Sequence, residues 1–179
     1  PKEYLYGDDP RVMTQLELAD QMKKGELDEP EQVVMIQCIG SRNEENPNCS
    51  RVCCQTAIKN ALHIKEKYPD AEVFVLYRDI RTYGLLEDYY TEARRQGVFF
   101  FRFDPEDPPV AEAAQDGIEV TFNDHVLNRK LSVSTDLLVL SAGMEAEDTE
   151  ELSSIVKLAR TPEGYFMEAH VKLRPVDMA

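Results

Sequence analysis

All four cysteines of the chain lie in one short stretch and follow the pattern Cys-x10-Cys-x3-Cys-Cys. They are Cys38, Cys49, Cys53 and Cys54. Thiolates in a group of four select zinc or an iron–sulfur cluster over hard cations such as magnesium. Four cysteines confined in this way are also too few and too close together for a disulfide-built scaffold. The spacing therefore predicts a single soft-metal site.

Spacing alone leaves other interpretations open. Structural zinc sites usually pair two Cys-x2–4-Cys knuckles, ferredoxins use Cys-x2-Cys-x2-Cys-x3-Cys, and this chain has neither pattern. Cys54 is followed at helical spacing by Ile58 and Ala61, which is also typical of a core residue. Cys38 extends an apolar strand and could be a core residue too, or could form a disulfide with Cys49 in an oxidising sample.

The cysteines lie between an apolar strand and an amphipathic helix. We expect the strand at Gln32–Gln37, whose Val-Val-Met-Ile run suits burial on both faces of a parallel sheet. We expect the helix at Arg51–Lys67, with Ser50 as its N-cap. A dinucleotide-binding domain carries its glycine fingerprint at such a junction. Only Gly40 is present here, so thiols stand where glycines would be.

The last three cysteines fall at or just inside the N-terminus of the predicted helix. Unpaired amides and the positive end of the helix dipole favour negative charge there, so we expect lowered thiol pKa values. Arg42 and Arg51 flank the cysteines and can offset part of the charge of a cluster. Cys38 lies at the end of the strand, so the strand end, one loop and one helical turn could together supply four ligands to a single site.

Strands and helices alternate from Gln32 to Phe103, which predicts a parallel sheet with right-handed crossovers. The fold class is therefore α/β: a three-layer Rossmann-like domain with a central parallel sheet and a small antiparallel β insertion. Residues 1–13 are expected to be irregular, and 104–117 to form a loop. The remaining helices are expected at Thr14–Gly25, Leu85–Gln96 and Thr149–Ala159. The remaining extended segments are expected at Glu72–Tyr77, Val98–Phe103, Ile118–Phe122, Leu131–Ser134, Asp136–Ser141 and Tyr165–Val171.

Bulk properties exclude several classes of function. The chain has 179 residues, of which 42% are hydrophobic and 30% charged, as in one soluble domain. Its net charge of −14 makes nucleic acid and anionic membranes poor partners. No apolar run approaches the ~20 residues that cross a bilayer and no signal peptide opens the chain, so we expect a cytoplasmic protein. The chain begins at Pro1 without an initiator Met, so we expect an excised piece of a longer protein.

The sequence predicts no catalytic residues. It contains no Ser–His–Asp pattern, P-loop or paired catalytic carboxylates. His63, His125 and His170 are scattered along the chain and are interpreted as structural or solvated. Electron transfer is the one chemical activity that the residues suggest.

The motif CIGSRN…CSRVCC around the cysteines is long and unusual, and the segments IQCIGSRN, CSRVCC and LYRDIRTYG follow one another along the chain. With TQLELADQMKKG upstream and EAHVKLRPVD near the end, the chain resembles the heterodisulfide reductase A-subunit family and its relatives in anaerobic microbes. The resemblance implies an FAD-containing protein with a thioredoxin-reductase-like core and several 4Fe-4S clusters, acting in electron bifurcation or electron transfer. It also implies that Cys38, Cys49, Cys53 and Cys54 are the ligands of the one cluster inserted in that core.

The resemblance further implies a domain organisation. In flavoproteins of this kind, an NAD(P)H domain is inserted between two halves of an FAD domain. Residues 32–144 resemble the inserted domain, 1–31 a connection from the FAD fold with one helix, and 145–179 a connection back to it. The glycine motif of the FAD fold is absent, so FAD is expected in the full-length parent and not in this chain. The expected partners are the FAD domain of the same parent chain and other electron-transfer subunits, without nucleic acid or membrane insertion.

Nicotinamide binding in the usual mode is disfavoured, because the glycines that admit a pyrophosphate are missing and a cluster would occupy the helix N-terminus. Arg78, in the Tyr77–Asp79 triplet, lies where such reductases read the ribose 2′ position. It is either a relic of a nucleotide site or an ordinary surface or ion-pair residue. The sequence thus predicts an electron-relay domain, with a nicotinamide-binding reductase domain or a zinc or thiol interaction module as alternatives. A cluster lost in air would leave free thiols, a disulfide or a disordered loop.

Overall fold

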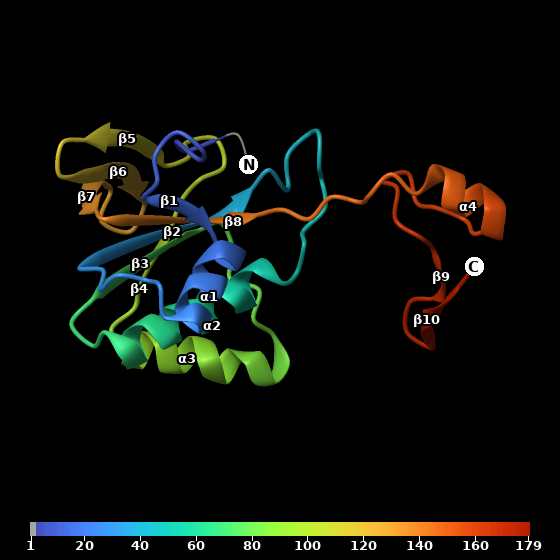
Figure 1. The fold of residues 1–179 in the computed structure, drawn as a ribbon, viewed down its shortest axis with the longest axis horizontal. Coiled ribbons are helices and arrows are strands. Elements are labelled where there is room, and N and C mark those ends of the chain that lie inside the picture. The colour runs from blue at the N-terminus through green and yellow to red at the C-terminus, as the bar shows by residue number, and fades with distance from the viewer. Residues whose placement is uncertain (1–2) are drawn as a thin grey trace.

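A five-stranded parallel sheet forms the centre of the computed structural model, which describes residues 3–179 (Figure 1). Its strands stand in the order β1, β8, β2, β3 and β4, and every neighbouring pair is parallel. In that order their bounds are Val12–Thr14, Leu137–Ala142, Gln32–Ile39, Glu72–Tyr77 and Phe99–Arg102. The predicted parallel sheet is confirmed. The irregular chain expected at residues 1 and 2 lies outside the described residues.

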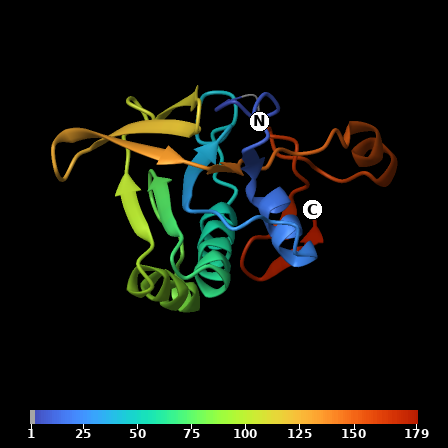
Figure 2. The same cartoon turned by 60° about the vertical axis from the view of Figure 1, so that its left-hand side comes forward.

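Both faces of this sheet are covered, which makes three layers (Figures 1 and 2). Three helices cover one face: α1 (Gln15–Lys24), α2 (Cys53–Lys67) and α3 (Glu87–Arg95). A three-stranded antiparallel sheet covers the other face: β5 (Val110–Ala114), β6 (Gly117–Asp124) and β7 (Arg129–Thr135). The predicted three-layer α/β class with an antiparallel insertion is therefore confirmed.

The side chains of the central strand β2 alternate between two hydrophobic cores. Val33 and Met35 belong to the core under the helices. Val34 and Ile36 belong to the core under the antiparallel sheet, and all four side chains are fully buried. A strand buried on both faces is apolar at every position, which is why this run predicts a strand without period-two alternation.

Helix α1 begins and ends at the predicted residues. The Thr14 hydroxyl oxygen accepts a hydrogen bond from the Glu17 amide at 3.3 Å, and the Thr14 amide donates to the Glu17 carboxylate at 2.7 Å. Gly25 closes the helix with a left-handed φ of 73°. This capping box and glycine stop satisfy the backbone groups at the two helix ends. Across residues 3–179, no helix combines the length and apolar character needed to cross a membrane.

Some boundaries differ from the prediction, and some strands lie where no strand was expected. The loop expected at 104–117 contains β5, because hydrogen bonding to β6 does not require a strongly apolar sequence on an outer strand. The helix expected at Leu85–Gln96 is divided into a 3-10 turn, Gly84–Leu86, and α3. β1 and β10 (Arg174–Met178) are short, show no clear alternation in sequence and were not expected.

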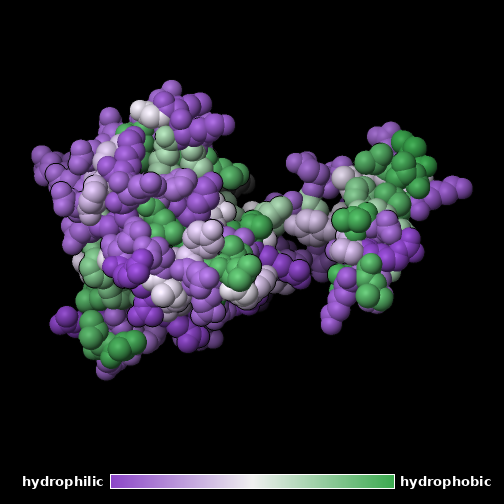
Figure 3. Space-filling view, turned by 90° about the horizontal axis from the view of Figure 1, so that it is seen from below, coloured by the Kyte–Doolittle hydropathy of each residue, from purple (hydrophilic) through white to green (hydrophobic). Residues whose placement is uncertain are grey.

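The C-terminal segment stands apart from the sheet, beyond a narrow connection (Figures 1 and 3). It contains α4 (Glu150–Val156), β9 (Glu168–His170) and β10. Within residues 3–179, the buried hydrophobic core ends at Leu140. Apolar side chains of the C-terminal segment are exposed, and Val176 is 83% exposed. This segment therefore contributes no buried hydrophobic residues to the domain.

Candidate functional site

A β-bulge at the end of β2 positions the first cysteine. Ile36 pairs with Leu140 of β8, and Ile39 pairs with Ala142, so β2 carries one extra residue between these two points. Cys38 lies in this extra length and has a φ of 65°. A bulge re-aims side chains, and a left-handed backbone is unfavourable for a residue with a Cβ. Backbone strain of this kind is concentrated at functional sites.

The loop between β2 and α2, residues 40–52, is here called the cysteine loop, and it is tied to the segment that follows β8. Asn46 Nδ2 donates to the carbonyl of Met144 at 3.2 Å. The Met144 amide in turn donates to Ser50 Oγ at 2.7 Å. Gly143 permits this approach, because a Cβ at that position would lie 2.6 Å from the Cβ of Ser41. The cysteine loop is thus held against the end of β8.

Helix α2 begins at Cys53 and not at the predicted Arg51. Ser50 is not its N-cap, because the Ser50 hydroxyl oxygen is engaged with the amide of Met144. Val52 occupies the N-cap position and makes no side-chain hydrogen bond to the helix. The first amides of α2 therefore lack an N-cap acceptor, in contrast to those of α1.

Two of the thiols contact the ends of other sheet strands. Cys53 Sγ donates to the carbonyl of Ala142 at 3.5 Å, at the end of β8. Cys54 Sγ donates to the carbonyl of Asp79 at 3.6 Å, just after β3. Both contacts lie at the carboxyl edge of the parallel sheet, where open α/β sheets bind their ligands.

The other two thiols accept hydrogen bonds from arginine residues, and all four cysteines are free thiols. The Arg51 amide donates to Cys49 Sγ at 3.4 Å. The Arg42 side chain donates from Nη1 to Cys38 Sγ at 4.0 Å, a long contact suited to sulfur. Arg42 and Arg51, which were predicted to flank the cysteines, thus each donate a hydrogen bond to a cysteine sulfur.

Burial raises the pKa of the thiols of Cys38, Cys53 and Cys54. The lowered pKa expected at the helix N-terminus is therefore wrong for Cys53 and Cys54, because burial disfavours the charged thiolate and is the largest influence on each thiol. Negative charge on Cys49 would raise the pKa of each of the other three thiols further.

Zinc and an iron–sulfur cluster place different demands on four cysteine ligands. Within residues 3–179, no group of three or more Cys, His, Asp or Glu side chains is arranged to hold a metal ion. A zinc ion needs its sulfur ligands at about 2.3 Å from one centre. An iron–sulfur cluster spreads its ligands over several irons, and its cysteines stand further apart. Four free thiols within one strand–loop–helix segment are a donor set that fits such a cluster in its chemistry.

Two buried polar side chains lie on adjoining strands next to this site. Gln37 and Ser141 are each 1% exposed. The amide group of Gln37 and the hydroxyl of Ser141 find no hydrogen-bond partner within residues 3–179. Strand alternation places both on the face covered by α2, because Met35 and Val139 belong to the core on that side. Buried polar groups are normally paired, so this end of the sheet suits a further polar group.

Arg78 lies against the cysteine loop. Its Nη1 donates to the carbonyl of Arg42 at 3.0 Å and to that of Ser41 at 3.5 Å. The carboxylate of Asp79 pairs with Arg42 at 2.7 Å and lies 3.7 Å from Arg81. Asp79 was not predicted as a site residue, since a carboxylate 37 positions away from Arg42 gives no local signal.

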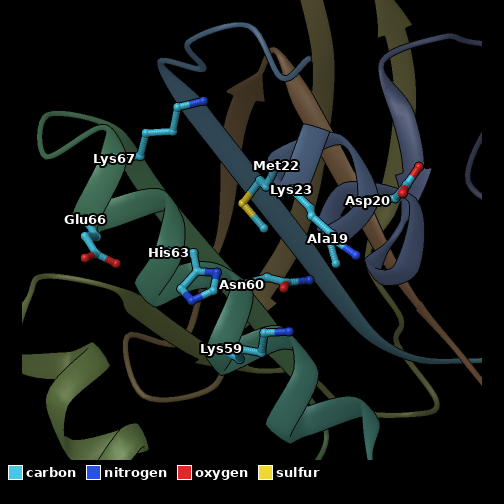
Figure 4. A pocket seen from close by; sticks show the side chains of 9 residues that line it. All are labelled: Ala19, Asp20, Met22, Lys23, Lys59, Asn60, His63, Glu66 and Lys67. Carbon is cyan, nitrogen blue, oxygen red and sulfur yellow. The ribbon is translucent and has the colours of Figure 1, made fainter. Parts of the chain in front are cut away.

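Two of the cavities in the described part of the chain contain charged side chains and no cysteine. One, of about 730 Å³, lies at the end of β3 and is lined by residues that include Arg78, Arg81 and Arg102. The other, of about 600 Å³, lies between α1 and α2, where His63 and lysine side chains approach from the two helices (Figure 4). No cysteine lines this second cavity, and its lysines are interspersed with Asp20 and Glu66, so its charge is mixed.

Comparison with known proteins identifies relatives over nearly the whole chain. No family model matches the chain. It is 40% identical, over 98% of its length, to the A-subunit of the H2/formate:CoB-CoM heterodisulfide,ferredoxin reductase of Methanococcus maripaludis. It is 36% identical, over 99% of its length, to the iron-sulfur A-subunit 2 of the CoB–CoM heterodisulfide reductase of Methanopyrus kandleri. The chain spans 29% of the length of each relative.

Solved structures share the fold at much lower sequence identity. A Cu(II) complex of a mutant flavoprotein disulfide reductase RclA from Escherichia coli matches 94% of this chain and 32% of its own, with a TM-score of 0.57 and 12% identity. Thioredoxin reductase from T. acidophilum matches 92% of this chain and 46% of its own, with a TM-score of 0.53 and 13% identity. At this identity the likeness shows a Rossmann-like fold, as in flavoprotein reductases.

Proposed function

Because this chain belongs to the heterodisulfide reductase A-subunit family over the segment that it shares with these relatives, we propose that it is an electron-transfer domain of an oxidoreductase. In this proposal Cys38, Cys49, Cys53 and Cys54 hold a 4Fe-4S cluster. The observation that supports it is the contact of the Cys53 and Cys54 thiols with the carboxyl edge of the sheet, in a chain whose four free cysteines all lie in the segment from β2 to the start of α2. A dinucleotide-binding relative would bind its pyrophosphate at this position.

The residues around the thiols suit this role. Partial burial of Cys38, Cys53 and Cys54 limits the access of water to the sulfur atoms. The N-terminus of α2 supplies amides, and Arg42 supplies a positive charge, both of which favour a negatively charged group. The thiols lose their protons when they become ligands, so binding releases protons. When bound, a 4Fe-4S cluster accepts and releases single electrons.

The parent protein would supply the chemistry that this chain lacks. In the proposal, residues 32–144 form the inserted domain, and 1–31 and 145–179 connect it to an FAD fold that holds the flavin. Exposed apolar side chains of the C-terminal segment, such as Leu173 and Val176, support a contact with that fold. Other electron-transfer subunits would exchange electrons with it. A cytoplasmic location goes with this proposal, because reducing compartments keep thiols free.

A nicotinamide-binding reductase domain is the second candidate, and the cavity at the end of β3 favours it. This cavity lies next to Arg78, at the strand end where a Rossmann domain reads the ribose. Arg78 itself is engaged with the carbonyls of the cysteine loop, which makes it less available to a nucleotide. Saturable binding of NADPH to the reconstituted protein would support this candidate.

Anaerobic reconstitution with iron and sulfide tests the primary proposal. We expect ~4 iron and ~4 sulfide per chain, with brown protein and broad visible absorption. The Cys49→Ser variant should lose most of its iron, because one of four ligands is gone. Thr56→Ser is the matched control, since it changes α2 without touching a thiol and should keep the wild-type iron content.

Two results would count against the cluster. Protein that stays folded and holds a single zinc, or no metal, would overturn the proposal for the whole site. Full iron content in Cys49→Ser would remove Cys49 from the ligand set and leave the other three thiols to be tested in turn.

A further inference from the structure

Arg42 lies between a thiol and a carboxylate. Its Nη1 donates to Cys38 Sγ at 4.0 Å, and its Nη2 donates to Asp79 Oδ2 at 2.7 Å. Its two terminal nitrogens therefore connect the first proposed ligand with a carboxylate that follows β3. The planar guanidinium is suited to such double contacts, and it stays charged at any pH that the protein tolerates.

Contacts to both the backbone and the side chain of Arg42 hold its guanidinium in place. Arg42 has a left-handed φ of 58°, and its carbonyl accepts a hydrogen bond from Arg78 Nη1 at 3.0 Å. Its side chain is only 20% exposed, so solvent screens the charge less than at the surface. The Asp79 side chain is 42% exposed, and Arg81 lies 3.7 Å from it. A positive charge thus lies beside Cys38, and the negative charge of Asp79 contacts the other terminal nitrogen of the same guanidinium.

The charge acts on the thiol in the direction expected from this geometry. Arg42 Nη1 lies 4.0 Å from Cys38 Sγ, so its positive charge attracts negative charge on this sulfur. Asp79 Oδ2 accepts from Arg42 Nη2 at 2.7 Å, so a negative charge is paired with the same guanidinium. Arg42 therefore stabilises negative charge on Cys38, and the carboxylate of Asp79, which pairs with the same guanidinium, offsets part of that positive charge.

We infer that Arg42 and Asp79 are positioning residues that set the reduction potential of the cysteine site in opposite directions. The inference rests on the proposed function. One-electron reduction adds one negative charge to the ligated group, with the electron supplied by the chemical reductant of the titration. Arg42 favours that added charge and raises the potential, whereas Asp79 disfavours it and lowers the potential.

A redox titration of reconstituted protein, monitored by electron paramagnetic resonance, measures this effect without any assay of activity. Arg42→Gln should lower the midpoint potential, and Asp79→Asn should raise it. We expect each variant to change the ratio of oxidised to reduced sites at a fixed potential by about tenfold, which is about 59 mV for one electron. Arg42→Lys keeps the charge and should restore most of the wild-type potential.

The controls separate charge from structure. Arg95→Gln removes the same charge from an exposed position on α3, where Arg95 pairs with Glu92, and it should leave the potential unchanged. General loosening of the cysteine loop would shift Arg42→Gln and Asp79→Asn in the same direction, and that result would overturn the inference. Midpoint potentials that are unchanged in both variants would also overturn the inference. If Arg42→Gln fails to hold iron, Arg42→Lys and Asp79→Asn still decide the question.

The outcome also distinguishes this inference from the proposed function. Wild-type protein that takes up no iron and sulfide would overturn the proposed function and this inference with it. Wild-type protein that holds the cluster, with a potential insensitive to Arg42 and Asp79, would overturn the inference alone.

Discussion

Asp79 shows how one residue can couple separate parts of the site. Its carboxylate pairs with Arg42 of the cysteine loop, and its carbonyl accepts a hydrogen bond from the Cys54 thiol. It lies just after β3, beside Arg78, which donates to the same loop. The end of β3 therefore binds both the loop and the first turn of α2. Loss of this carboxylate should affect the stability of the protein as well as the chemistry of the site.

The ion pair of Asp79 predicts a specific response to acid. The hydrogen bond from Arg42 holds the pKa of Asp79 below its unfolded value. A carboxylate whose folded pKa is lowered stabilises the protein above its unfolded pKa, about 3.9, and loses this contribution as pH falls toward the folded pKa. We therefore expect the free energy of unfolding, measured with urea, to fall as the pH drops below about 4.

Asp79→Asn should reduce the slope of this acid dependence, because one titrating carboxylate is removed. Asp70→Asn, a change on the exposed surface after α2, is the control for the loss of one negative charge. The pair of Asp9 with Arg11 contributes in the same pH window and is unaffected by either variant. Equal slopes in Asp79→Asn and wild-type protein would contradict the assignment.

At the scale of elements, α1 and α2 begin in different ways. Helix α1 has a complete capping box at Thr14 and Glu17, whereas α2 begins after Val52 without a side-chain cap. A capped terminus satisfies its own amides, while an uncapped one leaves them for another acceptor. In this domain the uncapped terminus belongs to the helix that carries Cys53 and Cys54. The stabilising cap and the candidate site are thus on separate helices.

Removing the cap of α1 should destabilise the protein without changing the site. Thr14→Ala deletes the acceptor for the Glu17 amide, and such losses cost about 1 kcal/mol. The free energy of unfolding by urea should fall by this amount, while iron uptake stays at the wild-type level. Thr14→Ser keeps the hydroxyl and should lose much less stability. A Thr14→Ala variant as stable as wild type would show that the capping box contributes nothing measurable.

At the scale of the whole molecule, the chain consists of a packed domain and a C-terminal segment outside its core. Among residues 3–179, every buried hydrophobic side chain lies between Val12 and Leu140. The segment after residue 144 forms its own β9–β10 pairing and exposes its apolar side chains. Figure 3 shows these apolar side chains as green patches on the part beyond the narrow connection. This surface fits a segment that packs against another part of a longer protein.

Deletion of residues 145–179 should therefore leave the domain folded. Stability depends mainly on the apolar surface that is buried, and the deleted residues add none to the two cores. We expect the midpoint of thermal unfolding, followed by circular dichroism, to change by only a few degrees. The iron content after reconstitution should also be unchanged. Loss of cooperative unfolding would show that the C-terminal segment is part of the folding unit.

Local patterns in the sequence by themselves determined the central strand, the start of α1 and the position of the candidate site. The apolar run at Val33–Ile36 identified the central strand, and the spacing of Thr14 and Glu17 identified the start of α1. The confinement of all four cysteines to one strand–loop–helix junction identified the candidate site. These features depend on residues that are close in the chain, so their period and spacing predict them directly.

The tertiary structure alone decided the geometry and chemistry within that site. The bulge at Cys38 depends on the register of β2 against β8, and the contact of Ser50 with Met144 moves the start of α2. The raised thiol pKa values follow from burial, and the pairing of Arg42 with Asp79 joins segments far apart in the chain. Strand register, burial and long-range ion pairs all depend on groups that packing brings together, and short-range sequence patterns do not encode those distances.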